Sequence, residues 1–315
     1  MRLSLIGLPP IDTLEEFSSV THLSKGLIYR LSRFADKNYL TYKLAKKSGG
    51  YRMIAQPSAE LKALQGWILK NILDRLTVSP ACKGFELKSS IIDNANPHIG
   101  ALAVLCLDLE DFFPSIKVNQ IWSVFHTLGY NLRIAGVLAS LCTFQGALPQ
   151  GSPASPKLSN LISIKMDKRL LGYASKRGII YTRYADDLSF SAMSYIKLAK
   201  SYPFFTEIIK SEGFQLNAAK TRFAGPARQH RITGLVVNDK HAGIGRVKLH
   251  KIRSKINHLC RYSKTQIPNE SVKHVVGWLA FIKSVDTTRY SILARYVRDL
   301  QAKYTDSGVS LLSVD

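Results

Sequence analysis

Apolar residues recur at intervals of three and four along much of the chain, which is the spacing of one face of an amphipathic helix. In the segment 59–77, for example, Leu61, Leu64, Ile68 and Ile72 follow this spacing. The same periodicity predicts helices over residues 23–34, 59–77, 116–129, 131–144, 155–178, 246–264, 271–285 and 289–304. Residues 197–221 predict a helix followed by a strand that ends near Lys220.

Other stretches carry strand signals. Residues 101–107 form a continuous apolar run, typical of a fully buried strand. Residues 179–182 and 188–191 alternate apolar and polar positions, which predicts two short strands joined by a tight turn. Two β-prone runs flank the glycines at 49 and 50 and predict a hairpin over 41–58. A further strand is predicted over residues 231–237. The chain should therefore fold as a mixture of helices and strands.

Two adjacent carboxylates, Asp186 and Asp187, stand at the turn between the two alternating runs. Like charges this close repel each other, and a divalent cation shared with a further acid relieves the repulsion. Asp108, which follows the buried run, supplies that acid. Carboxylates from separate strands that hold two Mg²⁺ ions are the arrangement of two-metal phosphoryl transfer. The alternatives are a solvated turn for the pair and a helix cap for Asp108.

The charge balance narrows the class of partner. Among 315 residues, 44 Lys and Arg stand against 22 Asp and Glu, which gives a net charge of +22 and a pI of about 9.9. This excess predicts a polyanion as partner, with nucleic acid first and an anionic membrane a distant second. No apolar run approaches the roughly 20 residues of a membrane-spanning helix, and the first residues lack a signal-peptide pattern. Four cysteines without a CxxC pair fit reduced thiols. We therefore expect a cytoplasmic protein that binds no membrane.

Four blocks of sequence carry a resemblance to a known family. They are DLEDFFPS at 108–115, LPQGSPASPKLSN at 148–160, YADD at 184–187 and GFQLNAAKT at 213–221. In this order and spacing they make roughly residues 40–240 resemble the reverse transcriptases. Two further blocks are similar to those of the bacterial retron enzymes: NANPH at 94–98, and Ile232–Thr233–Gly234 with Ile in place of the usual Val.

The resemblance implies a right-hand polymerase fold of the α/β (α+β) class. An N-terminal helix and fingers would occupy residues 1–100, and further fingers helices 116–160. A palm with an antiparallel sheet would occupy 101–240, and a helical thumb 241–315. The implied activity is that of an RNA-directed DNA polymerase, with Asp108, Asp186 and Asp187 as ligands of two Mg²⁺ ions.

The resemblance also implies roles around an incoming dNTP. Arg52 matches the fingers arginine that covers the triphosphate, and Phe113 matches the aromatic residue that packs against C2′ of the sugar. Gln150 and Gly151 would border the nascent base pair, and Lys220 would protonate the leaving pyrophosphate. Each also has a structural alternative: solvated basic side chains, a core phenylalanine, or a glycine that only marks the start of a helix. The hairpin carries further basic residues at Lys43, Lys46 and Lys47.

A second set of residues is predicted to bind RNA. Asn94 and His98 would shape the RNA or primer site, although both residue types also stabilise turns. Thr233 and Gly234 belong to the retron-like triplet. The predicted helix over 246–264 carries basic residues with no acid to pair at i+4, which favours a surface that follows phosphates over a merely solvated one. These basic residues are Arg246, Lys248, Lys251, Arg253 and Lys255.

For a retron enzyme the implied template and primer belong to one structured non-coding RNA. DNA synthesis would start from an internal 2′-hydroxyl and give multicopy single-stranded DNA. The resemblance also suggests a role in antiphage defence with a separate effector protein. One alternative is a group II intron-like or other prokaryotic reverse transcriptase, although the intron form would be expected to carry maturase and endonuclease extensions. The other is an RNA-binding scaffold that controls a toxin.

Overall fold

The structure is a computed structural model and describes residues 2–46, 49–238 and 240–314. Its internal contacts divide the chain into two units, each described by itself. Unit 1 consists of Met1–Ser90, Leu105–Ala192 and Ile196–Phe223, and unit 2 of Ile91–Val104, Met193–Tyr195 and Ala224–Asp315. None of the helices in the described ranges is both long and apolar enough to cross a membrane. The predicted class is confirmed, since helices are combined with antiparallel strands.

Unit 1 contains a group of helices packed through their apolar faces. The helix predicted from residue 59 is confirmed as α4 (Ala59–Asn71), in which Leu61, Leu64 and Ile68 are buried. It ends earlier than predicted, because Leu73–Arg75 tightens into a 3₁₀ turn. The neighbouring α8 contacts α3, α4 and α7. The bounds in this group are α1 (Arg2–Leu5), α2 (Leu14–Thr21), α3 (Lys25–Arg33), α7 (Val118–Leu128) and α8 (Leu132–Leu141).

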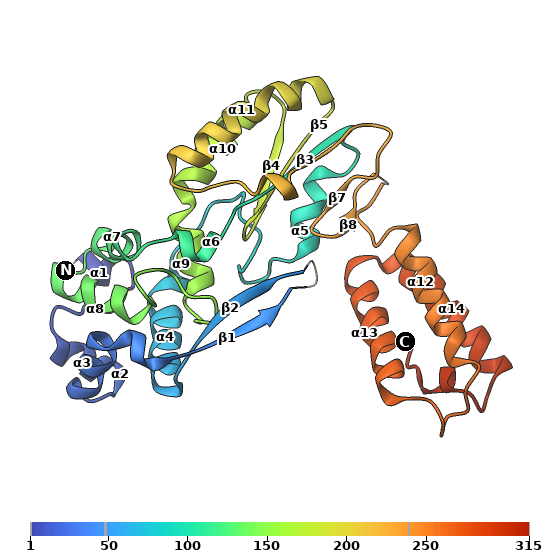
Figure 1. The fold of residues 1–315 in the computed structure, drawn as a ribbon, viewed down its shortest axis with the longest axis horizontal. Coiled ribbons are helices and arrows are strands. Elements are labelled where there is room, and N and C mark those ends of the chain that lie inside the picture. Colours follow the sequence, from blue (N-terminus) through green and yellow to red (C-terminus); the bar gives the residue numbers. More distant parts are fainter. Residues whose placement is uncertain (1, 47–48, 239, 315) are drawn as a thin grey trace. The chain divides into compact units, whose positions relative to one another are not determined.

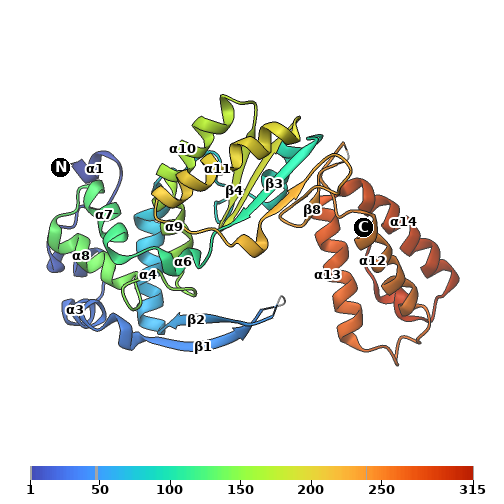
Figure 2. The ribbon, with the colours of Figure 1, turned by 45° about the horizontal axis from the view of Figure 1, so that its top comes forward.

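The predicted hairpin is confirmed as β1 (Tyr39–Ala45) and β2 (Tyr51–Pro57), which pair antiparallel. Figures 1 and 2 show this two-stranded ribbon extending away from α4. Most of its side chains are exposed, so few buried apolar contacts hold it in place. Of the predicted basic residues, Lys43 and Lys46 are described, whereas Lys47 lies outside the described residues.

The helix predicted over 155–178 is two helices, α9 (Ser155–Ile162) and α10 (Ile164–Ser175). The break falls at Ser163, whose Oγ donates to the Ser159 carbonyl at 2.8 Å. A serine that bonds back to the carbonyl four residues earlier competes with the helix and bends it. After the break, α10 contacts strand β4 (Ile180–Tyr184).

A four-stranded sheet in the order β4–β5–β3–β6 carries the acidic positions. Helices α10 and α11 (Tyr195–Ser211) lie over β4 and β5 in Figure 1. The Phe190 ring stacks on Tyr181 and on Phe205 of α11, with ring centroids 4.8 and 4.0 Å apart. This packing holds β4 and β5 against helix α11. The remaining bounds are β3 (Ala103–Asp108), β5 (Asp187–Ala192) and β6 (Arg222–Ala224).

The prediction of a strand that ends near Lys220 is wrong in position. Leu216 makes a single antiparallel bridge with Leu109, and Ala218–Lys220 is a 3₁₀ turn. The place beside β3 is taken instead by β6, which begins only at Arg222. Residues 215–217 therefore pair with residues 108–110 through two backbone hydrogen bonds, and the 3₁₀ turn separates this bridge from β6.

Unit 2 combines a small hairpin with three long helices. The strand predicted over 231–237 is wrong in detail: Thr233 and Gly234 have φ angles of 45° and 84° and form the turn between two short strands. The three predicted helices are confirmed, and the last residues also pack, with Val309 and Leu312 buried. The bounds are α5 (Ile91–Ala95), β7 (Arg231–Ile232), β8 (Leu235–Val236), α12 (Arg246–Leu259), α13 (Asn269–Val285) and α14 (Thr287–Lys303).

Candidate active site

The predicted hairpin at Asp186 is confirmed, with Ala185 and Asp186 as the two-residue turn between β4 and β5. Ala185 has a φ of 57°, a left-handed conformation that is unfavourable for a residue with a Cβ. Two contacts hold it there. Arg183 Nη1 donates to the Ala185 carbonyl at 3.1 Å, and Gly84 packs so closely that an added Cβ would lie 2.6 Å from the Ala185 nitrogen.

Asp108 reaches this turn through the order of the sheet. Strand β3, which ends at Asp108, lies beside β5, which begins at Asp187. The Leu109 nitrogen donates to the Asp186 carbonyl at 3.0 Å, so the end of β3 is tied to the turn. The Asp108 side chain is mostly buried. Residues far apart in the sequence thus bring three acidic residues to the same end of the sheet.

Burial and neighbouring negative charge raise the pKa of two of these acids, Asp186 and Asp187. Burial, and then the charges of Asp186 and Asp108, raise the pKa of Asp187 to about 6. The pKa of Asp186 is raised as well, first by burial and then by Asp108. Positive groups oppose this, because Lys220 and Arg52 each act to lower the pKa of Asp186. The excess of negative charge here favours a cation.

Lys220 forms an ion pair with Asp108, one of the three acids. Its Nζ donates to both carboxylate oxygens of Asp108, each at 2.9 Å. This hydrogen bond raises the pKa of Lys220, since the ammonium form is the one that Asp108 stabilises. About half of the Lys220 side chain is exposed, so the lysine can swing away from the carboxylate.

The carboxylate oxygens are the hard donors that Mg²⁺ prefers, so the chemistry of this set fits the ion. Within the described ranges, however, no three His, Cys, Asp or Glu side chains are grouped closely enough to form a metal site. The Lys220 ammonium contacts both oxygens of the Asp108 carboxylate, where it would compete with a metal ion. A metal ion at Asp108 would have to displace the lysine.

A cavity of about 1010 Å³ in unit 1 brings the predicted site residues together. It is bordered by the β1–β2 hairpin, the segment that follows β3, the segment 149–156 and the turn at Asp186. Asp187 begins β5 and directly follows the lining residue Asp186 in the chain. The predicted residues that line the cavity are Arg52, Asp108, Phe113, Gln150, Gly151, Asp186 and Lys220.

The two adjacent phenylalanines of α6 (Phe112–Ser115) have different environments. Phe112 is buried, with its ring centroid 5.6 Å from that of Phe214. Phe113 is half-buried and lines the cavity. Asp111, just before them, has a φ of 43°, so the chain turns sharply at this point. The role predicted for Phe113 at the sugar stays a prediction.

The Gln150–Gly151 segment is docked on the hairpin. The Ala55 nitrogen donates to the Gln150 carbonyl at 2.8 Å, and a Cβ at Gly151 would lie 2.5 Å from the Ala55 oxygen. Gly151 therefore approaches strand β2 closely and also lines the cavity, and its role beside a nucleotide stays a prediction. Gln150 Oε1 is buried and has no hydrogen-bond partner within the described part of the chain. It is available to accept a hydrogen bond from a ligand in the cavity.

Comparison with known proteins decides the family. The family model "Reverse transcriptase (RNA-dependent DNA polymerase)" matches residues 44–237. The chain belongs to the reverse transcriptase family. It is 48% identical over 305 residues to the retron Ec86 reverse transcriptase of Escherichia coli. The matched region covers 96% of this chain and 94% of that protein.

Two further relatives come from Myxococcus xanthus. The chain is 33% identical over 316 residues to the retron Mx65 reverse transcriptase, covering 93% of this chain and 73% of that one. It is 32% identical over 336 residues to the retron Mx162 reverse transcriptase, covering 94% and 68%. The predicted resemblance is confirmed: the protein is a retron reverse transcriptase and an RNA-directed DNA polymerase.

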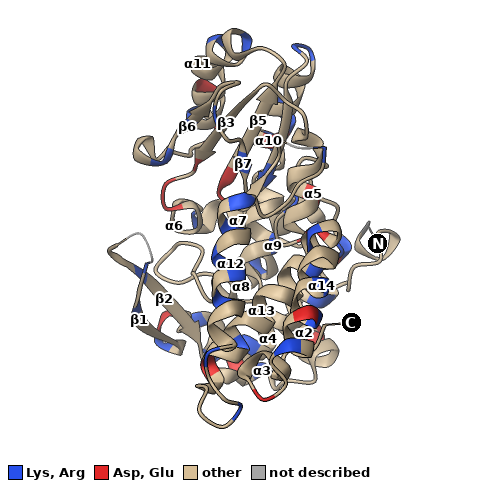
Figure 3. Ribbon diagram, turned by 90° about the vertical axis from the view of Figure 1, so that its right-hand side faces the viewer, with Lys and Arg blue, Asp and Glu red and all other residues tan. Residues whose placement is uncertain are grey.

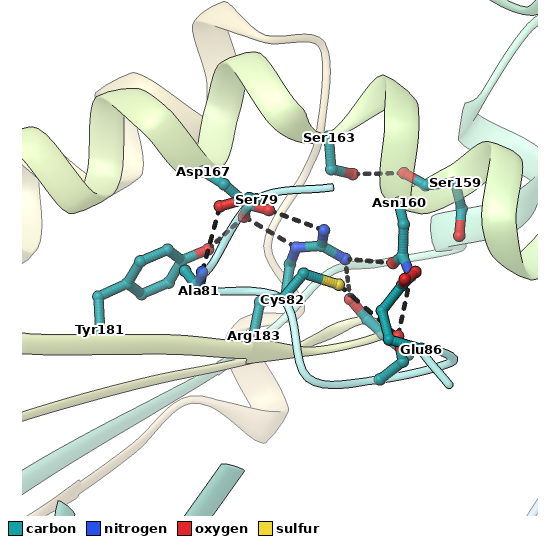
Figure 4. A network of polar contacts seen from close by, with 12 residues as sticks. Ser79, Ala81, Cys82, Glu86, Ser159, Asn160, Ser163, Asp167, Tyr181 and Arg183 are labelled. Atoms are coloured by element: carbon teal, nitrogen blue, oxygen red, sulfur yellow. Dashed lines mark hydrogen bonds and ion pairs between the residues drawn. The ribbon is translucent and has the colours of Figure 1, made fainter. Parts of the chain in front are cut away.

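The reverse transcriptase also contains a buried charge network that sequence reasoning missed (Figure 4). Arg183 and Asp167 are both fully buried. Arg183 donates to the two Asp167 oxygens at 2.9 and 2.8 Å and to Asn160 Oδ1 at 3.1 Å, and the Tyr181 hydroxyl donates to Asp167 at 2.8 Å. An acid on the apolar face of a predicted helix was the available signal, because such a residue needs a buried partner.

In unit 2 the residues predicted to bind RNA have different environments. Asn94 and His98 are fully buried, so RNA could touch them only if this segment opened. Thr233 Oγ1 donates to the Ile91 carbonyl at 3.4 Å, and Lys248 Nζ donates to the Gly234 carbonyl at 3.0 Å. Both contacts stay within unit 2 and hold the hairpin turn to its neighbours. RNA binding by these residues stays a prediction.

The basic side chains of α12 are more accessible. Figure 3 marks Lys and Arg along this helix in blue. Arg253 lies over the Tyr296 ring of α14, with its guanidinium carbon 4.4 Å from the ring centroid. Lys255 Nζ lies 3.0 Å from His274 Nε2 of α13. The exposed members of the predicted set are Arg246, Lys251, Arg253 and Lys255.

Proposed function

We propose that the cavity in unit 1 is the site where this enzyme adds dNTPs to a primer hydroxyl. The observation that carries the proposal is the meeting of Asp108, Asp186, Arg52 and Phe113 in one cavity, although they come from separate parts of the chain. A cavity with acids on one side and an arginine on the other suits a ligand with a metal-bound triphosphate.

Asp108, Asp186 and Asp187 would hold two Mg²⁺ ions. When bound, these ions would lower the pKa of the primer hydroxyl and balance the charge of the leaving pyrophosphate. Arg52, on the exposed hairpin, would pair with the triphosphate and close over it. Phe113 would lie against the sugar, and Gln150 would accept a hydrogen bond from the nucleotide or the nascent base pair.

Lys220 would act twice in this scheme. Its ammonium group balances the charge of Asp108 before the ions and the nucleotide arrive. Once displaced, the same ammonium would lie near the triphosphate and could give its proton to the leaving pyrophosphate. The exposed stem of the lysine allows this movement without a change in the backbone.

The nucleic acid would be a structured non-coding RNA and its DNA copy, with synthesis beginning at an internal 2′-hydroxyl of that RNA. The exposed basic residues of α12 would bind its phosphates. Thr233, Gly234 and Lys248 would contribute from the hairpin turn, and Asn94 and His98 would act by shaping unit 2 from within. We further propose a role in antiphage defence together with a separate effector protein, in line with the retron family.

The test compares Asp108→Asn and Asp186→Asn with the wild type in dNTP incorporation on nucleic acid that co-purifies with the enzyme. Each variant removes one metal ligand, so incorporation should fall to background at saturating Mg²⁺ while RNA binding persists. Asp74→Asn, at an exposed acid away from the cavity, is the matched control and should behave as wild type. Wild-type incorporation by either of the first two variants would refute the proposed site.

A further inference from the structure

Phe85 lines the cavity, yet the proposed function gives it no role. It borders the same space as Asp108, Asp186 and Phe113. Nearly half of it, 45%, is exposed. Its φ of 62° lies in the left-handed region, which bulky residues rarely adopt. An exposed ring on a strained backbone adds little to the stability of the fold, and strain of this kind collects at functional sites.

The loop around Phe85 is fixed on both sides. Before it, Gly84 packs against the turn of the YADD hairpin, where an added Cβ would lie 2.6 Å from the Ala185 nitrogen. After it, Glu86 Oε1 accepts a hydrogen bond from Asn160 at 2.9 Å, as Figure 4 shows. Because both neighbours are anchored, the backbone of Phe85 has no room to relax.

The ring stands between two other aromatic residues. Its centroid lies 6.2 Å from that of Phe113 and 6.4 Å from that of Tyr184. Tyr184 directly precedes the turn that carries Asp186. Phe85 and Phe113 both line the cavity and give it an apolar wall, which suits the flat surfaces of a base and a deoxyribose better than a charged triphosphate.

We propose that Phe85 contacts the nucleoside part of the incoming dNTP and is a specificity-determining residue of the polymerase reaction. The proposal rests on the proposed function, because it takes this cavity as the nucleotide site. The Gly84 contact ties the loop to the hairpin that positions Asp186, and the Glu86 contact ties it to Asn160 of α9. The same turn of the hairpin therefore supports both the loop that carries Phe85 and the acid Asp186.

The experiment measures single-nucleotide incorporation on a fixed primer–template with Phe85→Gly and Phe85→Tyr. Glycine removes the ring and relieves the backbone strain, so KM for dNTP should rise about tenfold while the melting temperature does not fall. Tyrosine keeps the ring and should leave KM within about twofold of wild type. Inhibition by inorganic tripolyphosphate, which has no nucleoside, should be equal in all three proteins.

Leu87→Gly is the matched control, because Leu87 belongs to the same loop and is 84% exposed. It should leave KM for dNTP unchanged. An unchanged KM in Phe85→Gly would overturn the proposal, and so would a fall in melting temperature and in kcat without a rise in KM, since that pattern marks a structural role. Weaker tripolyphosphate inhibition would also overturn it, because the ring would then serve the phosphates.

Failure of this inference is distinguishable from failure of the proposed site. If Asp186→Asn abolishes incorporation and Phe85→Gly leaves KM unchanged, only the assignment of Phe85 falls. If Asp186→Asn retains incorporation, the cavity is not the polymerase site and both proposals fall together.

Discussion

Phe112 and Phe113 are neighbours in the sequence, but the sharp turn at Asp111 places their side chains in different environments. Phe112 is buried, and its ring centroid lies 5.6 Å from those of Phe113 and Phe214. Phe113 is thereby supported from behind while it faces the cavity. A ring with rigid backing can exclude a small group by shape, which a soft apolar pocket does poorly.

We therefore expect Phe113→Val to admit ribonucleotides. The smaller side chain leaves room for a 2′-hydroxyl, so rNTP use relative to dNTP use should rise by at least about tenfold, a shift of roughly 1.4 kcal/mol. Single-nucleotide kinetics with matched dNTP and rNTP measures the ratio. An unchanged ratio with intact dNTP activity would place Phe113 in the core. Phe112→Val, at the buried neighbour, should reduce stability without changing the ratio.

His98 shows how burial alone sets a pH dependence. Burial lowers its pKa from the ordinary 6.5 to about 4. The unfolded chain regains the ordinary value and so binds more protons than the folded state between pH 6.5 and 4. Stability is then fully present above pH 6.5 and falls as the pH drops, by about 2 kcal/mol between pH 7 and pH 5.

The corresponding experiment is urea unfolding of the wild type and His98→Gln at pH 7 and pH 5. Glutamine cannot take up a proton, so the loss between the two pH values should shrink by about 2 kcal/mol. His250→Gln, at an exposed histidine, should keep the wild-type pH dependence. If His98→Gln and the wild type lose equal stability, another group must carry the pH dependence.

At the scale of elements, the pair Arg183–Asp167 joins helix α10 to strand β4 just before the YADD turn. Both side chains are fully buried, and the guanidinium meets the carboxylate through two hydrogen bonds. A third bond, from Arg183 to the Ala185 carbonyl, holds the turn itself. The network therefore links the stability of this region to the position of Asp186.

We expect Arg183→Met to lower the free energy of unfolding by about 3–5 kcal/mol, because it leaves the Asp167 carboxylate buried without a positive charge to pair with. The double variant Arg183→Met with Asp167→Leu removes both charges and should recover much of that loss in urea unfolding. Its kcat should nevertheless stay low, since Ala185 lacks its donor. Recovery of both stability and kcat would mean that the turn does not depend on Arg183.

The elements show why sequence patterns predicted some parts of the site and missed others. The apolar run before Asp108 and the alternation around Asp186 are local signals, so the strand and the hairpin could be predicted. In the segment 213–221 only Leu216 forms a bridge to another strand, and which residues pair in this way depends on tertiary structure. Arg183 and Asp167 pair across a helix and a strand, so their partnership appears only once these elements are packed.

At the scale of the whole molecule, the net charge of +22 predicts strong attraction to RNA without saying where it acts. The structure separates the basic side chains by environment. Lys157 is buried against Glu86, with 2.7 Å between Nζ and Oε2, and Lys220 is paired with Asp108. The exposed residues of α12 pair with no acid among the described ion pairs. Phosphate binding should therefore depend more on α12 than its share of the charge suggests.

We expect the basic residues of α12 to account for much of the salt dependence of RNA binding. Each phosphate contact contributes about 0.7–0.9 to the slope of log K against log salt, so the triple variant Lys251→Ala, Arg253→Ala, Lys255→Ala should flatten the slope by about 2–3. Filter binding from low to high salt measures it. The control, Lys264→Ala, Lys273→Ala, Lys303→Ala, removes the same charge from other exposed positions of unit 2 and should change the slope less. Equal slopes for the α12 variant and the wild type would mean that this face of the helix is only solvated.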